Sequence, residues 1–219
     1  MSPSPLRQLL VALVVVIFTV QDGVLKALLI KRSAPPFEGW WALPGGVFAG
    51  DQPLEAAASR RLVTETGLAD VYLEQLYTFS GLDAERPAIA VTYFALVDSA
   101  GVRLRPSVEG EWPPAWHPVA DLPELAFNNA AVVEYAVERL RYKLDYTNVA
   151  YSLLPECFTM SQLQTVYESI LNRRLDKRNF RKWILARGLV RATGRTQAVG
   201  AHRPAQLYAF TKREPVVIP

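Results

Sequence analysis

The residues between positions 45 and 67 have the types and spacing to hold a phosphorylated ligand. Gly45 and Gly46 carry no side chains, so a turn formed here lets a ligand approach the backbone closely. After them, apolar residues recur every three or four positions until Gly67, which predicts a helix ending at this glycine. Arg61 on this helix and Arg32 before it offer planar guanidinium groups, which bind phosphate oxygens in pairs. These residue types together can bind an anionic group.

The same segment resembles the Nudix box, whose pattern is G-x5-E-x7-R-E-U-x-E-E-x-G-U, where U is an apolar residue. The register is fixed by Gly46, Arg60, Leu62, Glu65, Gly67 and Leu68. The preceding sequence Trp-Ala-Leu-Pro-Gly-Gly at positions 41–46 is also typical of this family. The resemblance covers residues 8–145 and implies a Nudix-type α/β/α sandwich with a mixed sheet.

Three of the four carboxylates in the Nudix pattern are replaced in this chain. Gln52 stands at the first glutamate, Arg61 at the glutamate after the arginine and Thr64 at the first of the paired glutamates. In the family these carboxylates hold divalent cations against a substrate diphosphate, and hard Mg²⁺ needs such oxygen ligands. A cation beside Arg61 would be repelled. We therefore expect no catalytic residue, no metal site, no cofactor and no efficient hydrolysis, with residual pyrophosphatase activity left open.

A site that has lost its metal ligands can still hold a nucleotide diphosphate. The expected ligand contacts are Arg32, Gly45, Gly46, Arg61 and Glu65. Two alternatives remain open. Glu65 can pair with Arg60 or Arg61, in which case the domain binds nothing. Trp40 and Trp41 can both be structural, or one of them can stack on a nucleobase.

A second group of residues, after position 158, has the types that bind nucleic acid. Residues 159–171 and 176–187 have the pattern of two helices joined by a short turn, and two short strands follow, at 189–192 and 206–210. That order predicts a winged helix-turn-helix. A capping box of Thr159 with Gln162 begins the first helix.

The second helix is the expected recognition helix, because its outer face is basic. Phe180, Trp183 and Ile184 can share the inner face. The N-terminal residues of a recognition helix contact base edges, so the candidates for groove contacts are Lys177, Arg178 and Asn179. Further DNA contacts are expected from basic residues of the same helix, the turn and the wing: Arg173, Arg174, Arg181, Lys182, Arg195, His202 and Arg203.

The elements that must position these residues can be read from hydrophobic periodicity. Residues 9–19 and 24–31 form a hairpin around a turn at 21–23. Further strands are expected at 71–79, 88–97 and 111–118, and a helix at 130–142. Residues 144–155 are low in charge and end in a proline, so they are expected to connect two domains. The last two strands enclose a loop that contains Gly194 and Gly200.

The net charge of +3 conceals a division of charge along the chain. Residues 1–154 carry 12 Lys and Arg against 17 Asp and Glu, a net charge of −5, and residues 155–219 carry 12 against 4, a net charge of +8. This division predicts a Nudix-like ligand-sensing domain over residues 1–147 and a DNA-binding domain over residues 148–219. A polyanion is the expected partner of the second domain, and a solvated basic face is the alternative.

Composition also indicates the compartment. The single Cys157 excludes a disulfide framework, and a reducing environment is expected. The apolar run at 9–20 is too short to span a bilayer, and a buried strand fits it better than a secretory segment. We expect a cytoplasmic protein with no membrane partner.

A degenerate Nudix domain joined to this C-terminal module resembles the NrtR family of bacterial Nudix-related transcriptional regulators. The resemblance is most specific at residues 72–79 (YLEQLYTF), 175–181 (LDKRNFR) and 202–208 (HRPAQLY). It implies a homodimer that binds palindromic double-stranded operator DNA, represses genes of NAD metabolism and responds to ADP-ribose or a related nucleotide. Two other functions fit the residues: a hydrolase of ADP-ribose-like nucleoside diphosphates, and a constitutive DNA-binding protein whose first domain only dimerises.

Overall fold

A computed structural model describes residues 9–67, 69, 71–80, 88–98, 100, 102, 104, 112–198 and 204–217 of the chain. The chain forms two compact units. Unit 1 takes in residues 1–18, 27–95 and 102–136, and unit 2 takes in residues 19–26, 96–101 and 137–219. Strand β1 (Leu10–Gln21) and helix α2 (Asn129–Tyr146) therefore begin in unit 1 and end in unit 2.

The larger sheet has seven strands in the described part of the chain, and five of them follow the order β3-β2-β1-β6-β5. These are β3 (Trp41–Ala42), β2 (Val24–Lys31), β1, β6 (Ala88–Leu96) and β5 (Tyr72–Ser80). Two short strands flank this path: β4 (Gly45–Val47) pairs with β1, and β7 (Ala115–Pro118) pairs with β2. The predicted hairpin and the strands at 71–79 and 88–97 are confirmed.

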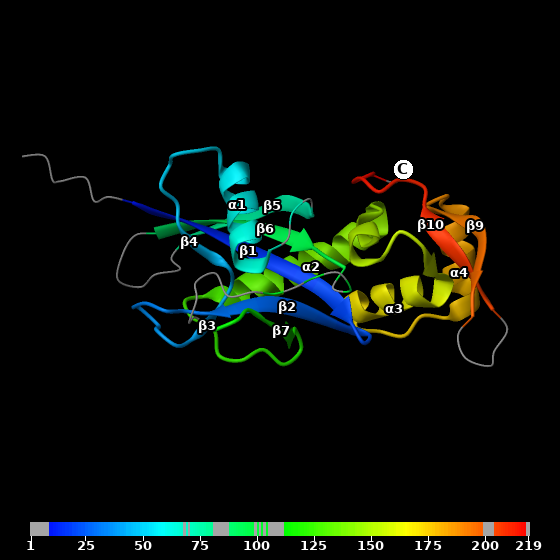
Figure 1. Ribbon diagram of the computed structural model, residues 1–219, viewed down its shortest axis with the longest axis horizontal. Coiled ribbons are helices and arrows are strands. Elements are labelled where there is room, and N and C mark those ends of the chain that lie inside the picture. Colours follow the sequence, from blue (N-terminus) through cyan, green and yellow to red (C-terminus); the bar gives the residue numbers. More distant parts are fainter. Residues whose placement is uncertain are drawn as a thin grey trace, which may run out of the picture. The chain divides into compact units, whose positions relative to one another are not determined.

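The centre of this sheet is buried because its strands are almost wholly apolar. Residues 13–19 of β1 are all buried, as expected of a strand covered on both faces. Helix α1 (Leu54–Thr66) crosses in front of the strands in Figure 1, and α2 passes behind them. Helix α1 ends at Gly67 in the left-handed conformation, with φ of 69°, as the sequence predicts. The Nudix-type sandwich is confirmed.

Unit 2 contains the winged helix-turn-helix. Helix α3 (Met160–Leu171) begins with the predicted capping box, and α4 (Lys177–Ala186) begins at Asp176, whose side chain accepts a hydrogen bond from the backbone of Asn179. The second sheet has three strands in the described residues, ordered β8-β10-β9. These are β8 (Phe158–Thr159), β10 (Ala205–Phe210) and β9 (Val190–Gln197). We call β9, β10 and the residues between them the wing.

Two predictions about this region need correction, and one strand was not predicted. Residues 144–155 are not a simple connection, because α2 continues to Tyr146 and a buried 3-10 helix, η2 (Val149–Leu153), follows. Gly194 lies inside β9 with a φ of 75° and not in a loop, because β9 is longer than its apolar residues indicate. The sequence analysis also missed the short strand β8, which has only two residues.

Asn148 explains why the segment before η2 is fixed in place. Its Nδ2 donates to the carbonyl oxygens of Lys212 and Glu214, at 3.0 and 2.9 Å, and its Oδ1 accepts from the backbone N–H of Val216 at 2.9 Å. A buried amide with this many partners holds the C-terminal segment against the start of η2.

Candidate effector site and DNA-binding surface

Gly45 and Gly46 lie in a strand and not in the predicted turn. In β4 they pair antiparallel with β1, Gly46 opposite Leu13 and Gly45 opposite Val14. A Cβ atom on Gly45 would stand 2.6 Å from the carbonyl oxygen of Leu13. A side chain is therefore excluded at this position by the close approach of β1, and not by a turn conformation.

The guanidinium of Arg61 lies against the backbone of Gly46. A Cβ atom on Gly46 would stand 2.5 Å from Nη2 of Arg61, so glycine is required for this approach. Helix α1 supplies Arg61 from the position where the Nudix pattern has a glutamate. The structure thus brings three predicted site residues together, and it places a positive charge beside the half-buried Gly46 of β4. Such a charge favours an anionic ligand.

The neighbouring Arg60 binds the residues that precede the helix. Its Nη2 lies 3.6 Å from Oδ2 of Asp51. The Gln52 amide, oriented to satisfy both groups, accepts from Nη2 of Arg60 at 2.6 Å and from Nε at 3.2 Å. Gln52 therefore keeps the hydrogen bond that a glutamate would make to Arg60, but it carries no charge for a cation.

These residues do not fit the divalent metal that a Nudix fold implies. An amide, a guanidinium and a hydroxyl replace three carboxylates, at Gln52, Arg61 and Thr64. The Thr64 hydroxyl donates to the carbonyl oxygen of Arg60 at 2.9 Å within its own helix. Among the described residues no three His, Cys, Asp or Glu side chains gather as metal ligands would. The Glu65 side chain lies outside the described residues. We derive no metal-assisted step here.

Arg32 is engaged by its own loop. Its Nε donates to the carbonyl oxygen of Pro36 at 2.8 Å, its Nη2 donates to that of Ala34 at 3.2 Å, and its guanidinium lies 4.8 Å from the centre of the Phe127 ring. Partial burial lowers the pKa of Arg32 from its ordinary value. These contacts give Arg32 a structural role in shaping the loop, beside any role toward a ligand.

The two tryptophans before β4 differ in their surroundings. Trp41 packs edge to face on His117, with ring centres 4.5 Å apart, and the ammonium of Lys31 lies 5.3 Å from its ring. Trp40 contacts Phe37 edge to face and is 38% exposed. Of the pair, Trp40 has the ring face more open to a ligand.

The recognition helix presents the residues that the sequence predicts. Phe180 and Ile184 are buried on its inner face, where Phe180 packs on Tyr167 with ring centres 5.2 Å apart. The predicted DNA-binding residues of α4 are all exposed: Lys177, Arg178, Asn179, Arg181 and Lys182. The side chain of Asp176 accepts a hydrogen bond from the backbone N–H of Asn179, which caps the first turn of α4. The side chains of this turn remain exposed.

The other predicted DNA-binding residues come from the turn and the wing. Arg173 and Arg195 are exposed, and Arg174 is exposed but lies 3.4 Å from Oε2 of Glu168. His202 and Arg203 lie outside the described residues.

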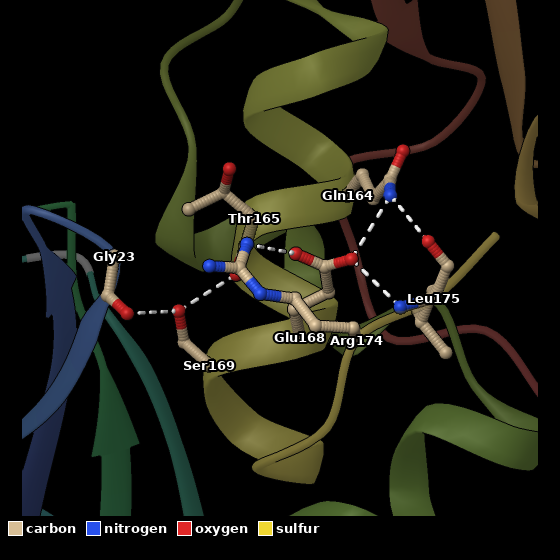
Figure 2. A network of polar contacts seen from close by, with 7 residues as sticks. All are labelled: Gly23, Gln164, Thr165, Glu168, Ser169, Arg174 and Leu175. Atoms are coloured by element: carbon tan, nitrogen blue, oxygen red, sulfur yellow. Dashed lines mark hydrogen bonds and ion pairs between the residues drawn. The ribbon is translucent and has the colours of Figure 1, made fainter. Parts of the chain in front are cut away.

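The turn between α3 and α4 is held by two side chains of α3, as Figure 2 shows. Oε1 of Glu168 accepts from the backbone N–H of Leu175 at 2.7 Å and from Nε2 of Gln164 at 2.9 Å. Nε2 of Gln164 also donates to the Leu175 carbonyl at 2.9 Å. The Leu175 hydrogen bond is the main cause that lowers the pKa of Glu168, followed by the Gln164 amide.

Two side chains near the expected DNA-binding surface were not among the sequence predictions. Tyr208 binds Arg181 from β10, and Arg191 is an exposed cation of β9. Conversely, two basic residues are structural. Arg187 lies 4.2 Å from the Trp183 ring and donates to the Asp145 carbonyl, and Arg213 donates to three carbonyl oxygens around η2. For the contacts of Gln164 and Glu168 with Leu175, the local signal is their spacing of four residues, which places both side chains on one face of α3.

Among the described residues, no helix has both the length and the apolar composition that crossing a membrane requires.

Two family models match this chain. The model of the NUDIX domain matches residues 9–136, and the model of the NrtR DNA-binding winged helix domain matches residues 150–210. The first match lies mostly within unit 1 and the second lies within unit 2.

Known proteins resemble the chain over nearly its full length. The ADPR responsive transcriptional repressor NtrR of Acinetobacter baylyi is 36% identical over 218 residues, which is 97% of this chain and 84% of that protein. Shewanella oneidensis NrtR, solved in complex with a 27mer DNA, is 33% identical with a TM-score of 0.80, over 92% of this chain and 93% of that chain. The NUDIX domain of the same protein, solved with ADP ribose, is 34% identical with a TM-score of 0.56, over 64% of this chain and 94% of that chain. This chain belongs to the NrtR family, in which a Nudix domain is joined to a DNA-binding winged helix domain.

Proposed function

We propose that this protein is a transcriptional repressor that binds operator DNA and releases it when ADP-ribose or a related nucleotide occupies the Nudix domain. The observation that carries the proposal is the Arg61 guanidinium lying against Gly46. A guanidinium can bind a diphosphate, and here it occupies a position where the Nudix pattern has a carboxylate for metal-assisted hydrolysis.

The relatives support both halves of this proposal. The Acinetobacter relative is named as a repressor responsive to ADPR, and the Shewanella protein was solved with DNA and, as its NUDIX domain, with ADP ribose. We extend these properties to this chain. The expected ligand contacts are Gly45, Gly46, Arg61, Glu65 and Arg32, with Trp40 beside them as a candidate for stacking on the base.

For the DNA, we propose that α4 enters the major groove. Lys177, Arg178 and Asn179 then reach base edges, and the remaining basic residues of the turn, helix and wing contact phosphates. A homodimer would place two such helices on half-sites about 34 Å apart, one helical turn of DNA. We place the boundary between the sensing and DNA-binding domains between residues 147 and 148. We propose that the target operons belong to NAD metabolism and that the protein acts in the cytoplasm.

We also propose that the protein does not use hydrolysis in its function. Gln52, Arg61 and Thr64 leave too few carboxylates to hold a metal against a diphosphate. The full-length relative is named as a repressor and not as a hydrolase.

The test is to titrate the purified protein onto DNA from the region upstream of its own gene, at one stated salt concentration, with and without ADP-ribose. Salt must be fixed because phosphate contacts make the affinity salt-dependent. The proposal predicts specific binding that weakens at least about fivefold with saturating ADP-ribose. Unchanged DNA affinity at saturating nucleotide would remove ADP-ribose as the effector.

A further inference from the structure

Three consecutive residues at the C-terminal end of α3 bind three different elements. Glu168 accepts from the backbone N–H of Leu175 in the turn before the recognition helix. The hydroxyl of Ser169 lies 2.8 Å from the carbonyl oxygen of Gly23, in the turn between β1 and β2, and 2.7 Å from that of Thr165 (Figure 2). The carbonyl oxygen of Ile170 accepts from Nε of Arg141 on α2 at 2.9 Å.

Two of these elements, β1 and α2, also contact residues 43–46, which lead into the candidate effector site. Near its start, β1 pairs with Gly45 and Gly46, and the backbone N–H of Val15 donates to the carbonyl oxygen of Pro44 at 2.8 Å. At the start of α2, the side chain of Asn129 accepts from the backbone N–H of Leu43 at 2.8 Å and is buried. Residues 43–46 are therefore bonded to both elements.

Both elements are continuous between these two ends, and each begins in unit 1 and ends in unit 2. Helix α2 is continuous from Asn129 to Arg141, a span of about 18 Å at the rise of an α-helix. Residues 13–19 of β1 are buried, and the turn beyond it is tight, with Asp22 and Gly23 both at positive φ. Helix α2, and β1 with the tight turn after it, thus run as regular structure from the residues bonded to 43–46 to the residues bonded to α3.

A diphosphate at Gly46 would meet the Arg61 guanidinium that lies against this residue. The guanidinium of Arg61 lies against Gly46, so a diphosphate that takes hydrogen bonds from Arg61 changes what packs on β4. Strand β4 pairs with β1, and it follows Leu43, which is hydrogen-bonded to Asn129 of α2. A change in the packing on β4 would therefore act on its contacts with both β1 and α2. This supplies the difference in contacts between free and bound states that a switch requires.

We propose that Ser169 and Arg141 are positioning residues that couple the effector site to the recognition helix. A change in the position of β1 would act on Ser169 through its contact with Gly23, and a change in the position of α2 would act on the Ile170 carbonyl through Arg141. The adjacent Glu168 would then alter its hydrogen bond to Leu175, in the turn before the recognition helix. This inference rests on the proposed function and adds the residues through which nucleotide binding alters DNA binding.

The experiment measures a coupling ratio, which is the Kd for upstream DNA at saturating ADP-ribose divided by the Kd without it. The full-length protein is compared with Ser169→Ala, Arg141→Ala and the double variant. Ser161→Ala is the matched control, because Ser161 is an exposed serine of the same helix. Ser169→Thr, which retains a hydroxyl, tests for rescue.

The proposal predicts that Ser169→Ala and Arg141→Ala each lower the coupling ratio about two- to tenfold, the effect of losing one hydrogen bond, and that the double variant lowers it further. The Kd for ADP-ribose alone and the Kd for DNA alone should stay within about twofold of the wild-type values, which a merely destabilised protein would not show. Ser161→Ala should keep the wild-type ratio, and Ser169→Thr should recover most of it.

A double variant with the wild-type coupling ratio would overturn this inference and leave the proposed function intact. A wild-type ratio of one would instead contradict the proposed function itself. Equal losses in the Ser161→Ala control would also count against the assignment, because the effect would then not be specific to the contacts of Ser169.

Discussion

Nη2 of Arg181 donates a hydrogen bond to Oη of Tyr208 across 2.7 Å, and its guanidinium lies 5.5 Å from the centre of the same ring. The contact joins the recognition helix α4 to strand β10 of the wing. Tyr208 is buried, so its hydroxyl is a fixed anchor for an otherwise exposed arginine. Two of the three segments with the most specific resemblance to the family, residues 175–181 and 202–208, are thus joined by a hydrogen bond.

Tyr208→Phe should weaken operator binding about three- to tenfold, because it removes this hydrogen bond and leaves the angle between helix and wing less constrained. The substitution changes no charge, so the slope of log K against log salt should stay as in the wild type. The measurement is DNA affinity over a series of salt concentrations. Wild-type affinity in Tyr208→Phe would mean that the contact does not position Arg181 for DNA.

Asn179→Ala should reduce discrimination between operator and random DNA by about 1–3 kcal/mol, because an asparagine at the start of a recognition helix can bind an adenine edge with two hydrogen bonds. Its backbone is capped by Asp176 whatever its side chain, so the helix should form normally. The check is competition between the two DNAs on the same protein. An equal loss of affinity for operator and random DNA would mean that Asn179 contacts the DNA backbone and not a base.

Glu168→Gln should change how the stability depends on pH. The pKa of Glu168 is lowered below its ordinary 4.5, chiefly by the backbone N–H of Leu175, so the ionised form stabilises the folded state. That stabilisation is fully present above about pH 4.5 and is lost as the pH falls through the lowered pKa of the folded state. The glutamine variant keeps an acceptor but has no charge to titrate.

The measurement is the free energy of unfolding of wild type and Glu168→Gln by denaturant, at several pH values between neutral and acid. The difference between the two proteins should be largest near neutral pH and should shrink in acid. A difference that stays constant over the whole range would contradict the assigned role of the carboxylate.

Tyr167→Phe should raise the free energy of unfolding by about 1 kcal/mol, because the Tyr167 hydroxyl is buried with no hydrogen-bond partner in the described structure. Its ring contacts with Phe180 and Trp183 would remain. Tyr142→Phe is the control, since Tyr142 is exposed and should change stability by less than about 0.5 kcal/mol. Clear destabilisation by Tyr167→Phe would show that the hydroxyl has a partner after all, such as a buried water.

The elements of this fold could be predicted where local sequence decides them. The apolar run of β1, the capping box at Thr159 and the left-handed Gly67 each act over a few residues, so periodicity and cap residues were enough. The recognition helix was predictable for the same reason, because its buried and exposed faces alternate with the helical period.

What could not be predicted depends on contacts between distant segments. Gly45 and Gly46 have the composition of a turn, and their pairing with Val14 and Leu13 of β1 makes them a strand. The segment before η2 has the composition of a connection, and its bonds to distant residues, among them those from Asn148 to the C-terminal segment, hold it in place. The partners of Arg181 and Ser169 lie 27 and 146 residues away, beyond the reach of any local pattern.

The central claim is that the site at Gly46 and Arg61 holds a nucleotide without cutting it. The most direct measurement is calorimetric titration of ADP-ribose into the protein with and without Mg²⁺, followed by chromatography of the nucleotide from the same cell. The claim predicts saturable binding, an affinity little changed by Mg²⁺, and ADP-ribose recovered intact. Conversion to AMP and ribose phosphate at an ordinary enzymatic rate, on the order of 1–10 per second, would contradict it.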